Sequence, residues 1–156
     1  MDTASRDEAR FEDFTGLIAA INKEVTRIKS VESAKLGLTG ADIMCLYYLG
    51  KHPQGMTAAE LARAASVTRA AVSRTLARME REGFVEIQAE QGATTRYRAA
   101  VMLTERGRKS AQGADIAITR VLDEVYAAQS DEEREQMYAS LRSVLGRLRT
   151  ISREDR

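Results

Sequence analysis

Apolar residues recur at alternating steps of four and three residues near both ends of the chain. The N-terminal set is Phe14, Ile18, Ile21, Val25 and Ile28. The C-terminal set is Met137, Leu141, Val144, Leu148 and Ile151. This spacing gives a helix one continuous apolar seam, as in helices that pack along their whole length against another helix. A chain of this size cannot easily bury two such seams alone, so we expect its folding unit to contain two copies.

Helix-breaking residues are scarce between these seams. The 156 residues include one proline, Pro53, and ten glycines, and much of the rest is Ala, Leu, Glu, Arg and Met, which favour helices. The length is typical of one domain. We therefore predict a mainly α-helical single domain over residues 1–156, with dimerisation helices over 10–36 and 105–152.

The middle of the chain carries several helix start and stop signals. Thr39 can cap a helix that runs to about Lys51. The Thr57-x-x-Glu60 pattern is a capping box, in which each side chain satisfies a backbone N–H of the other residue, and it predicts a short helix to about Ala65. After a turn at 66–68, a second helix is expected over 69–82 and ends at Gly83.

The apolar period changes from 3.6 to 2 after Gly83. Val85 and Ile87 alternate with polar residues, and Val101 and Leu103 do so on the far side of a turn near Gly92. This pattern predicts a two-stranded hairpin over 84–103. Two short helices followed by a hairpin form a winged helix-turn-helix, which we expect over 38–104. Such a lobe lays its second helix in the DNA major groove.

Three segments carry a resemblance to the multiple antibiotic resistance regulator (MarR) family. They are Leu61-Ala62, residues 72–85 (VSRTLARMEREGFV) and residues 103–107 (LTERG). The resemblance extends over about residues 10–150. It implies a homodimeric transcription regulator with intertwined terminal helices, most commonly a repressor that binds a pseudo-palindromic operator in double-stranded DNA. It also implies a small-molecule effector that alters DNA binding.

The helix over 69–82 divides into two faces. Val72, Leu76 and Met79 share a stripe that should face the core. On the opposite face, arginines can donate paired hydrogen bonds to guanine, and small side chains allow close approach to the bases. Arg78 is better placed for a backbone phosphate. The residues predicted to contact DNA are Thr68, Arg69, Ala70, Ser73, Arg74, Arg78, Arg96 and Arg98.

The last two of these lie in the wing. An arginine near a wing tip can enter the narrow minor groove, where the potential is most negative. Family wings commonly carry Asp-x-Arg ahead of the Leu-Thr pair, but this chain has Thr95 and Tyr97 at those positions. Either Arg96 or Arg98 would have to replace the missing arginine.

Tyr47, Tyr48 and Cys45 lie in the expected helix that ends near Lys51. The tyrosines can line an effector cavity, as the resemblance suggests, or belong to the core. Cys45 is either a small core residue or a redox sensor, and its apolar neighbours favour the core. His52 follows that helix, where a cation suits the helix dipole, so we expect a capping role.

The composition excludes several function classes. One cysteine and one histidine cannot form a disulfide or a Cys/His zinc cluster. No glycine-rich phosphate loop and no nucleophile paired with a base is recognisable, so we predict neither an enzyme nor a cofactor site. The apolar run 43–49 is far shorter than the roughly 20 residues of a membrane span. With no signal-peptide pattern at residues 1–10, we expect a cytoplasmic protein.

The net charge of +1 leaves a second interpretation open. A near-neutral chain with an altered wing could use its winged lobe to bind a protein and no specific DNA. Salt-dependent binding to duplex DNA would distinguish the two.

Overall fold

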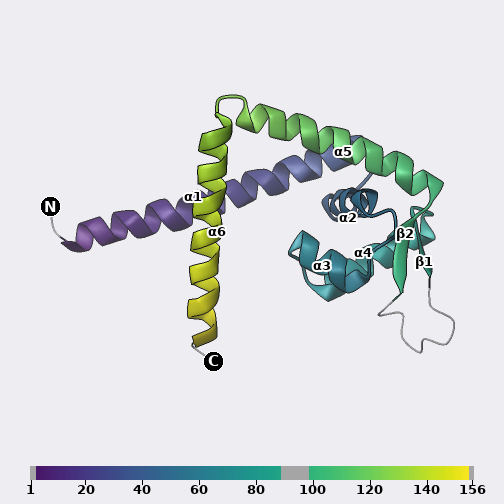
Figure 1. Cartoon of the computed structure of the whole chain (residues 1–156), viewed down its shortest axis with the longest axis horizontal. Helices are drawn as coiled ribbons and strands as arrows, with labels where there is room; N and C mark the ends of the chain where they lie inside the picture. Colours follow the sequence, from purple (N-terminus) through teal and green to yellow (C-terminus); the bar gives the residue numbers. More distant parts are fainter. Residues whose placement is uncertain (1–2, 89–98, 155–156) are drawn as a thin grey trace. The chain divides into compact units, whose positions relative to one another are not determined.

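The computed structural model describes residues 3–88 and 99–154 (Figure 1). Their elements, in chain order, are α1 (Thr3–Lys35), α2 (Gly40–Lys51), α3 (Ala58–Ala65), α4 (Arg69–Arg81), β1 (Val85–Gln88), β2 (Ala100–Leu103), α5 (Glu105–Tyr126) and α6 (Asp131–Glu154). The chain divides into two compact units, Met1–Ala117 and Ile118–Arg156, and α5 begins in the first and ends in the second. The predicted fold class, mainly α with one small hairpin, is confirmed.

Helix α1 ends at a left-handed glycine and α2 begins at a capping box. Gly37 has φ +68°, a conformation that side chains with a Cβ rarely adopt. The Thr39 N–H then donates to Asp42 Oδ2 over 2.8 Å, and the Asp42 N–H donates to Thr39 Oγ1 over 3.3 Å. These two bonds fix the start of α2 where the sequence predicted it.

Helices α3 and α4 form the predicted helix-turn-helix. Thr57 and Glu60 make the expected capping box, and Thr68 caps α4 by accepting from the Ala71 N–H over 3.2 Å. The turn between the helices passes through Ser66, whose φ of 54° is left-handed.

Strands β1 and β2 pair antiparallel and in register. Val85 lies opposite Leu103, and Ile87 lies opposite Val101. The second strand also bonds to the loop before α3: the Met56 N–H donates to the Val101 carbonyl over 3.1 Å, and the Val101 N–H donates back over 2.8 Å. The hairpin is therefore tied to the helix-turn-helix at its base.

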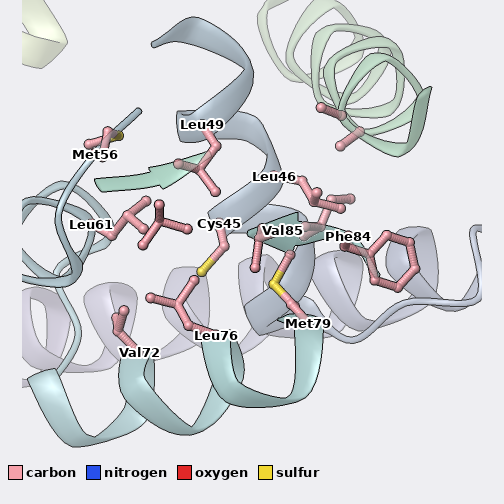
Figure 2. Packing of buried hydrophobic residues seen from close by; sticks show 14 of the residues in the cluster. Cys45, Leu46, Leu49, Met56, Leu61, Val72, Leu76, Met79, Phe84 and Val85 are labelled. Carbon is pink, nitrogen blue, oxygen red and sulfur yellow. The ribbon is translucent and has the colours of Figure 1, made fainter. Parts of the chain in front are cut away.

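The core of the first unit gathers side chains from α2, α3, α4 and the hairpin (Figure 2). Val72, Leu76 and Met79 are its contribution from α4, each at most 3% exposed. The predicted inward stripe of α4 is thereby confirmed. Burial of these side chains fixes which face of α4 remains outside.

Helix α6 of the second unit begins at another capping box, formed by Ser130 and Glu133. The hydroxyls of Tyr126 and Tyr138 are hydrogen-bonded to each other, which ties α5 to α6. That bond raises the pKa of Tyr126.

Both seams found in the sequence contain exposed apolar side chains. On α1 these are Phe14, Ile18, Ile21 and Val25, and Leu17 and Val31 are exposed outside the seam. On α6 they are Leu141, Val144, Leu148 and Ile151, and Leu145 is exposed outside the seam. Such a concentration of apolar surface is typical of a face that another chain covers. Over 3–88 and 99–154, none of the helices is both long and apolar enough to cross a membrane.

Candidate nucleic-acid interface

The outer face of α4 presents the residue types that read base edges. Arg69, Ala70, Ser73 and Arg74 are all exposed, and Thr68 is exposed at the N-cap. They occupy the N-terminal half of the helix, which is the part that reaches bases when a recognition helix enters the major groove. The structure thus brings five of the predicted contact residues together on one surface.

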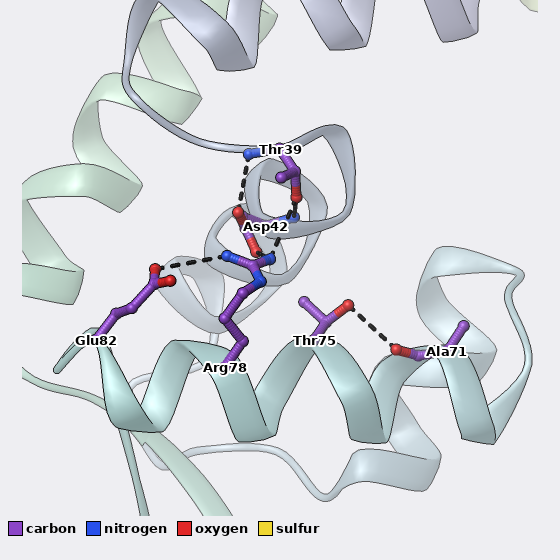
Figure 3. Close-up of polar contacts among 6 residues, drawn as sticks. All are labelled: Thr39, Asp42, Ala71, Thr75, Arg78 and Glu82. Carbon is purple, nitrogen blue, oxygen red and sulfur yellow. Dashed lines mark hydrogen bonds and ion pairs between the residues drawn. The ribbon is translucent and has the colours of Figure 1, made fainter.

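Arg78 makes bonds inside the first unit that the sequence did not suggest. Its guanidinium forms an ion pair with Asp42 of α2, donates to Thr39 Oγ1 over 3.3 Å and approaches Glu82 at 3.5 Å (Figure 3). The Asp42 side chain is only 1% exposed, whereas that of Arg78 is 32% exposed. These bonds hold α4 against α2, and the phosphate contact expected for Arg78 stays a prediction.

Electrostatics and burial explain this arrangement. A buried carboxylate without a cation is costly, and Arg78 supplies the charge while Thr39 supplies a backbone donor. The bond to Asp42 also raises the pKa of Arg78 above its usual value. Asp42 consequently serves both as a helix cap and as an anchor for the recognition helix.

The turn after α4 is bonded to the start of α5. Thr104 Oγ1 donates to the Gly83 carbonyl over 2.6 Å, and the Thr104 N–H donates to the Phe84 carbonyl over 3.1 Å. Arg106 Nη1 donates to the Glu82 carbonyl over 2.7 Å. Thr104 Oγ1 also accepts from the Gly107 N–H over 3.0 Å, so one residue caps α5 and binds the turn.

A cavity of about 350 Å³ lies beside these elements. Its lining residues come from the end of α2 and the following turn, from β2 and from α5: Tyr47, Leu49, Gly50, Lys51, His52, Pro53, Met102, Leu103, Arg108, Ala111, Gln112 and Asp115. Of the two tyrosines proposed from the sequence, Tyr47 lines this cavity, and Tyr48 packs against the core.

The cavity combines apolar walls with a few charged groups. Lys51 Nζ lies 2.6 Å from Asp115 Oδ1 and 5.3 Å from the centre of the Tyr47 ring. The hydrogen bond to Asp115 raises the pKa of Lys51. Arg108 is a second cation in the lining and donates to the Leu103 carbonyl over 3.0 Å. Apolar walls with a few polar groups are usual in small-molecule sites.

Cys45 and His52 both have local structural roles. Cys45 is 4% exposed, and burial raises the pKa of its thiol to about 11. Because the thiolate is the reactive form, these observations favour the core interpretation over redox sensing. His52 is the C-cap of α2, and its Nδ1 lies 2.8 Å from the Tyr48 carbonyl oxygen.

The remaining predicted contacts, Arg96 and Arg98, lie outside the described residues. Among the residues that are described, no group of three or more His, Cys, Asp and Glu side chains could hold a metal ion.

Comparison with known proteins identifies one family. Residues 36–93 match the model of the MarR family. The HTH-type transcriptional repressor Rv2887 of Mycobacterium tuberculosis (strain ATCC 25618 / H37Rv) is 36% identical over 107 residues, which cover 66% of this chain and 75% of that protein.

Three solved structures are similar to this chain over most of its length. The Staphylococcus aureus MepR–DNA complex has a TM-score of 0.77 and 25% identity, covering 88% of this chain and 97% of that one. Rv2887 of M. tuberculosis in complex with salicylic acid has a TM-score of 0.60 and 28% identity, covering 82% and 93%. The same protein in complex with DNA has a TM-score of 0.59 and 27% identity, covering 83% and 95%.

Proposed function

Because the chain belongs to the MarR family, we propose that it is a homodimeric, sequence-specific DNA-binding transcription repressor that a small molecule releases from its operator. The observation that carries this proposal is the two-sided α4, whose Val72, Leu76 and Met79 are buried while Arg69, Ser73 and Arg74 are exposed. Similarity to relatives that were solved with DNA supports the same conclusion.

In this proposal α4 enters the major groove by its N-terminal half. Arg69 and Arg74 donate paired hydrogen bonds to guanine O6 and N7, and Ser73 reaches a base or a phosphate. Ala70 leaves room for close approach. Thr68 lies at the helix N-terminus, whose exposed N–H groups attract a phosphate.

The dimer brings two such helices to one operator. We propose that the exposed seams of α1 and α6 pack against the same seams of a second copy of the chain. Burying apolar surface is the main favourable term in such an association. Two recognition helices related by a two-fold axis would then read half-sites about 34 Å apart. A pseudo-palindromic operator follows from that symmetry.

Selection of bound sequences from random duplex DNA by the full-length protein tests this function. A two-fold symmetric consensus is expected. Arg74→Ala should lower the affinity for that consensus about 5- to 100-fold and relax the preference at one base pair of each half-site. Lys109→Ala, which removes an exposed cation on α5 (side-chain exposure 77%), is the matched control and should leave both unchanged.

The competing interpretation, a protein-binding module, makes the opposite prediction. Duplex DNA would then be bound weakly or without sequence preference, and Arg74→Ala would change nothing. A steep fall in affinity with rising salt, together with a selected consensus, rules it out.

We further propose that the cavity beside α5 is the effector site. A small aromatic carboxylate can place its ring against Tyr47 and its charge at Lys51, in place of Asp115, and a relative was solved with salicylic acid. Salicylate is therefore the first probe, and calorimetry measures its affinity for the protein. Lys51→Met should weaken its binding about tenfold or more, as expected for the loss of a charged hydrogen bond, while Lys109→Ala should not.

Two broader predictions follow from this function. The protein acts by binding and not by catalysis, in line with relatives described as transcriptional repressors. It also acts where the regulated DNA is, so we propose the cytoplasm as its compartment.

A further inference from the structure

We propose that the first two turns of α5 clamp the C-terminal end of α4 and transmit changes in the cavity to it, with Arg106 as the positioning residue. The effect on DNA rests on the function proposed above, whereas the clamp itself does not. The proposal names a route by which an occupant of the cavity alters the recognition helix.

The clamp consists of donors from the start of α5 that hold three successive carbonyls. Arg106 Nη1 holds the Glu82 carbonyl, Thr104 Oγ1 holds that of Gly83, and the Thr104 N–H holds that of Phe84, over 2.7, 2.6 and 3.1 Å. These carbonyls follow directly on α4, which ends at Arg81. Any displacement of the start of α5 therefore pulls on the end of α4.

Two further contacts make this junction tight. The Arg106 guanidinium lies 4.4 Å from the centre of the buried Phe84 ring, close enough for cation–π attraction. The Phe84 N–H donates to the Met79 carbonyl in the last turns of α4 over 2.9 Å. A Cβ on Gly107 would lie 2.0 Å from the Phe84 carbonyl oxygen, so the backbones are in direct contact there.

The same turns of α5 also form one wall of the cavity. Arg108, Ala111, Gln112 and Asp115 of α5 line it, and they follow directly on the clamp residues Thr104 and Arg106. A helix moves as a stiff unit over such a short span, since each turn is hydrogen-bonded to the next. A displacement of the lining residues of α5 therefore also displaces Thr104 and Arg106.

The opposite wall comes from α2, which holds α4 at a different point. Tyr47, Leu49 and Lys51 face the cavity from the end of α2, and Asp42 at its start binds Arg78. The recognition helix is thus anchored to one wall at Arg78 and to the other wall just beyond Arg81. Separating the walls changes the relative position of the anchors, and α4 must tilt to follow.

The first test measures the clamp without DNA. Gln112→Trp in the full-length protein places a large side chain at the cavity from an exposed position, and Lys109→Trp is its control on the same helix, at a residue outside the lining. We expect Gln112→Trp to speed amide hydrogen exchange about 3- to 30-fold at Phe84 and Thr104, whose N–H groups form the junction. Unchanged exchange at both amides would overturn the clamp.

The second test is a double-mutant cycle on operator affinity. Gln112→Trp and Arg106→Ala should each weaken binding about 3- to 30-fold. If the effect of the filled cavity travels through Arg106, the double variant is weakened much less than the product of the single effects. Fully multiplicative effects, or a Gln112→Trp protein that binds as the wild type does, would refute the route.

A direct phosphate contact by Arg106 would look different. In that case Arg106→Lys would keep most of the affinity. Arg106→Ala would reduce the slope of log affinity against log salt concentration by about one. We expect Arg106→Lys to lose affinity and Arg106→Ala to leave the salt dependence unchanged. Lysine cannot both stack on Phe84 and hold the Glu82 carbonyl as the planar guanidinium does. If the wild-type protein selects no DNA sequence while Gln112→Trp still speeds exchange at Phe84 and Thr104, the proposed function is refuted and the clamp stands.

Discussion

The ion pair between Arg78 and Asp42 allows a quantitative test of how α4 is held. Arg78→Met keeps most of the apolar stem and removes the charge. The Asp42 carboxylate, 1% exposed, would retain the Thr39 N–H as a donor over 2.8 Å and lose its cation. Removing one partner of a fully buried pair costs about 3–5 kcal/mol. Because Arg78 is 32% exposed and water can reach its place, we expect about 2–3 kcal/mol.

The reverse substitution should be less harmful. In Asp42→Asn the amide oxygen can still accept from the Thr39 N–H, and Arg78 can turn toward Glu82, 3.5 Å away, or toward water. We expect a loss of about 1 kcal/mol, near the net value of one hydrogen bond. The double variant should be more stable than Arg78→Met alone, because no unpaired charge remains buried.

Urea unfolding at one fixed protomer concentration measures these differences, since a dimer's stability depends on concentration. Arg27→Met, which breaks an exposed pair with Glu24 (63% and 54% exposed), is the control and should cost under about 0.5 kcal/mol. The reasoning fails if Arg78→Met costs no more than Asp42→Asn. It also fails if the stability lost in the double variant equals the sum of the losses in the two single variants.

Two further outcomes concern the scaffold. The folded Cys45 thiol ionises at about pH 11, against 9.0 for an ordinary thiol, so unfolding releases a proton in this window and stability is lost as the pH rises through it. Relative to Cys45→Ala, the loss in the free energy of unfolding reaches on the order of 2 kcal/mol by pH 11. Urea melts of both proteins at several pH values measure it, and an equal dependence of stability on pH in the two would contradict it. Ser66→Gly should stabilise the protein by up to about 1 kcal/mol, because glycine adopts the left-handed φ of 54° without strain. Ser66→Val should do the opposite, and a thermal melt that ranks valine above serine would rule out this explanation.

Local signals predicted the elements of this fold well. Thr39 and Thr57 cap the helices that the sequence assigned to them, because a cap depends on residues at most three positions apart. The change of period after Gly83 located both strands, and the hairpin register follows from the same alternation. Such features need no knowledge of the rest of the chain.

Long-range contacts could not be predicted in the same way. On a helical wheel Arg78 lies one turn beyond Arg74, a spacing that predicted a phosphate contact for Arg78 and gave no sign of a bond to α2. Its partner Asp42 lies 36 positions earlier in the chain and comes within reach only once α2 packs on α4. The cavity is likewise made by α2, β2 and α5 together, so the sequence could suggest Tyr47 but not the cations around it.

The two roles of arginine on α4 explain why net charge is a poor guide here. Arg74 is exposed on the outer face, whereas Arg78 neutralises a carboxylate inside the same unit. The net charge of +1 sums both kinds of arginine, so it does not tell where a basic surface lies. The same internal pair fixes α4 against one wall of the cavity, while Thr104 and Arg106 fix it against the other. The residues that hold the recognition helix, and not those that touch DNA, then determine how a bound molecule alters DNA binding.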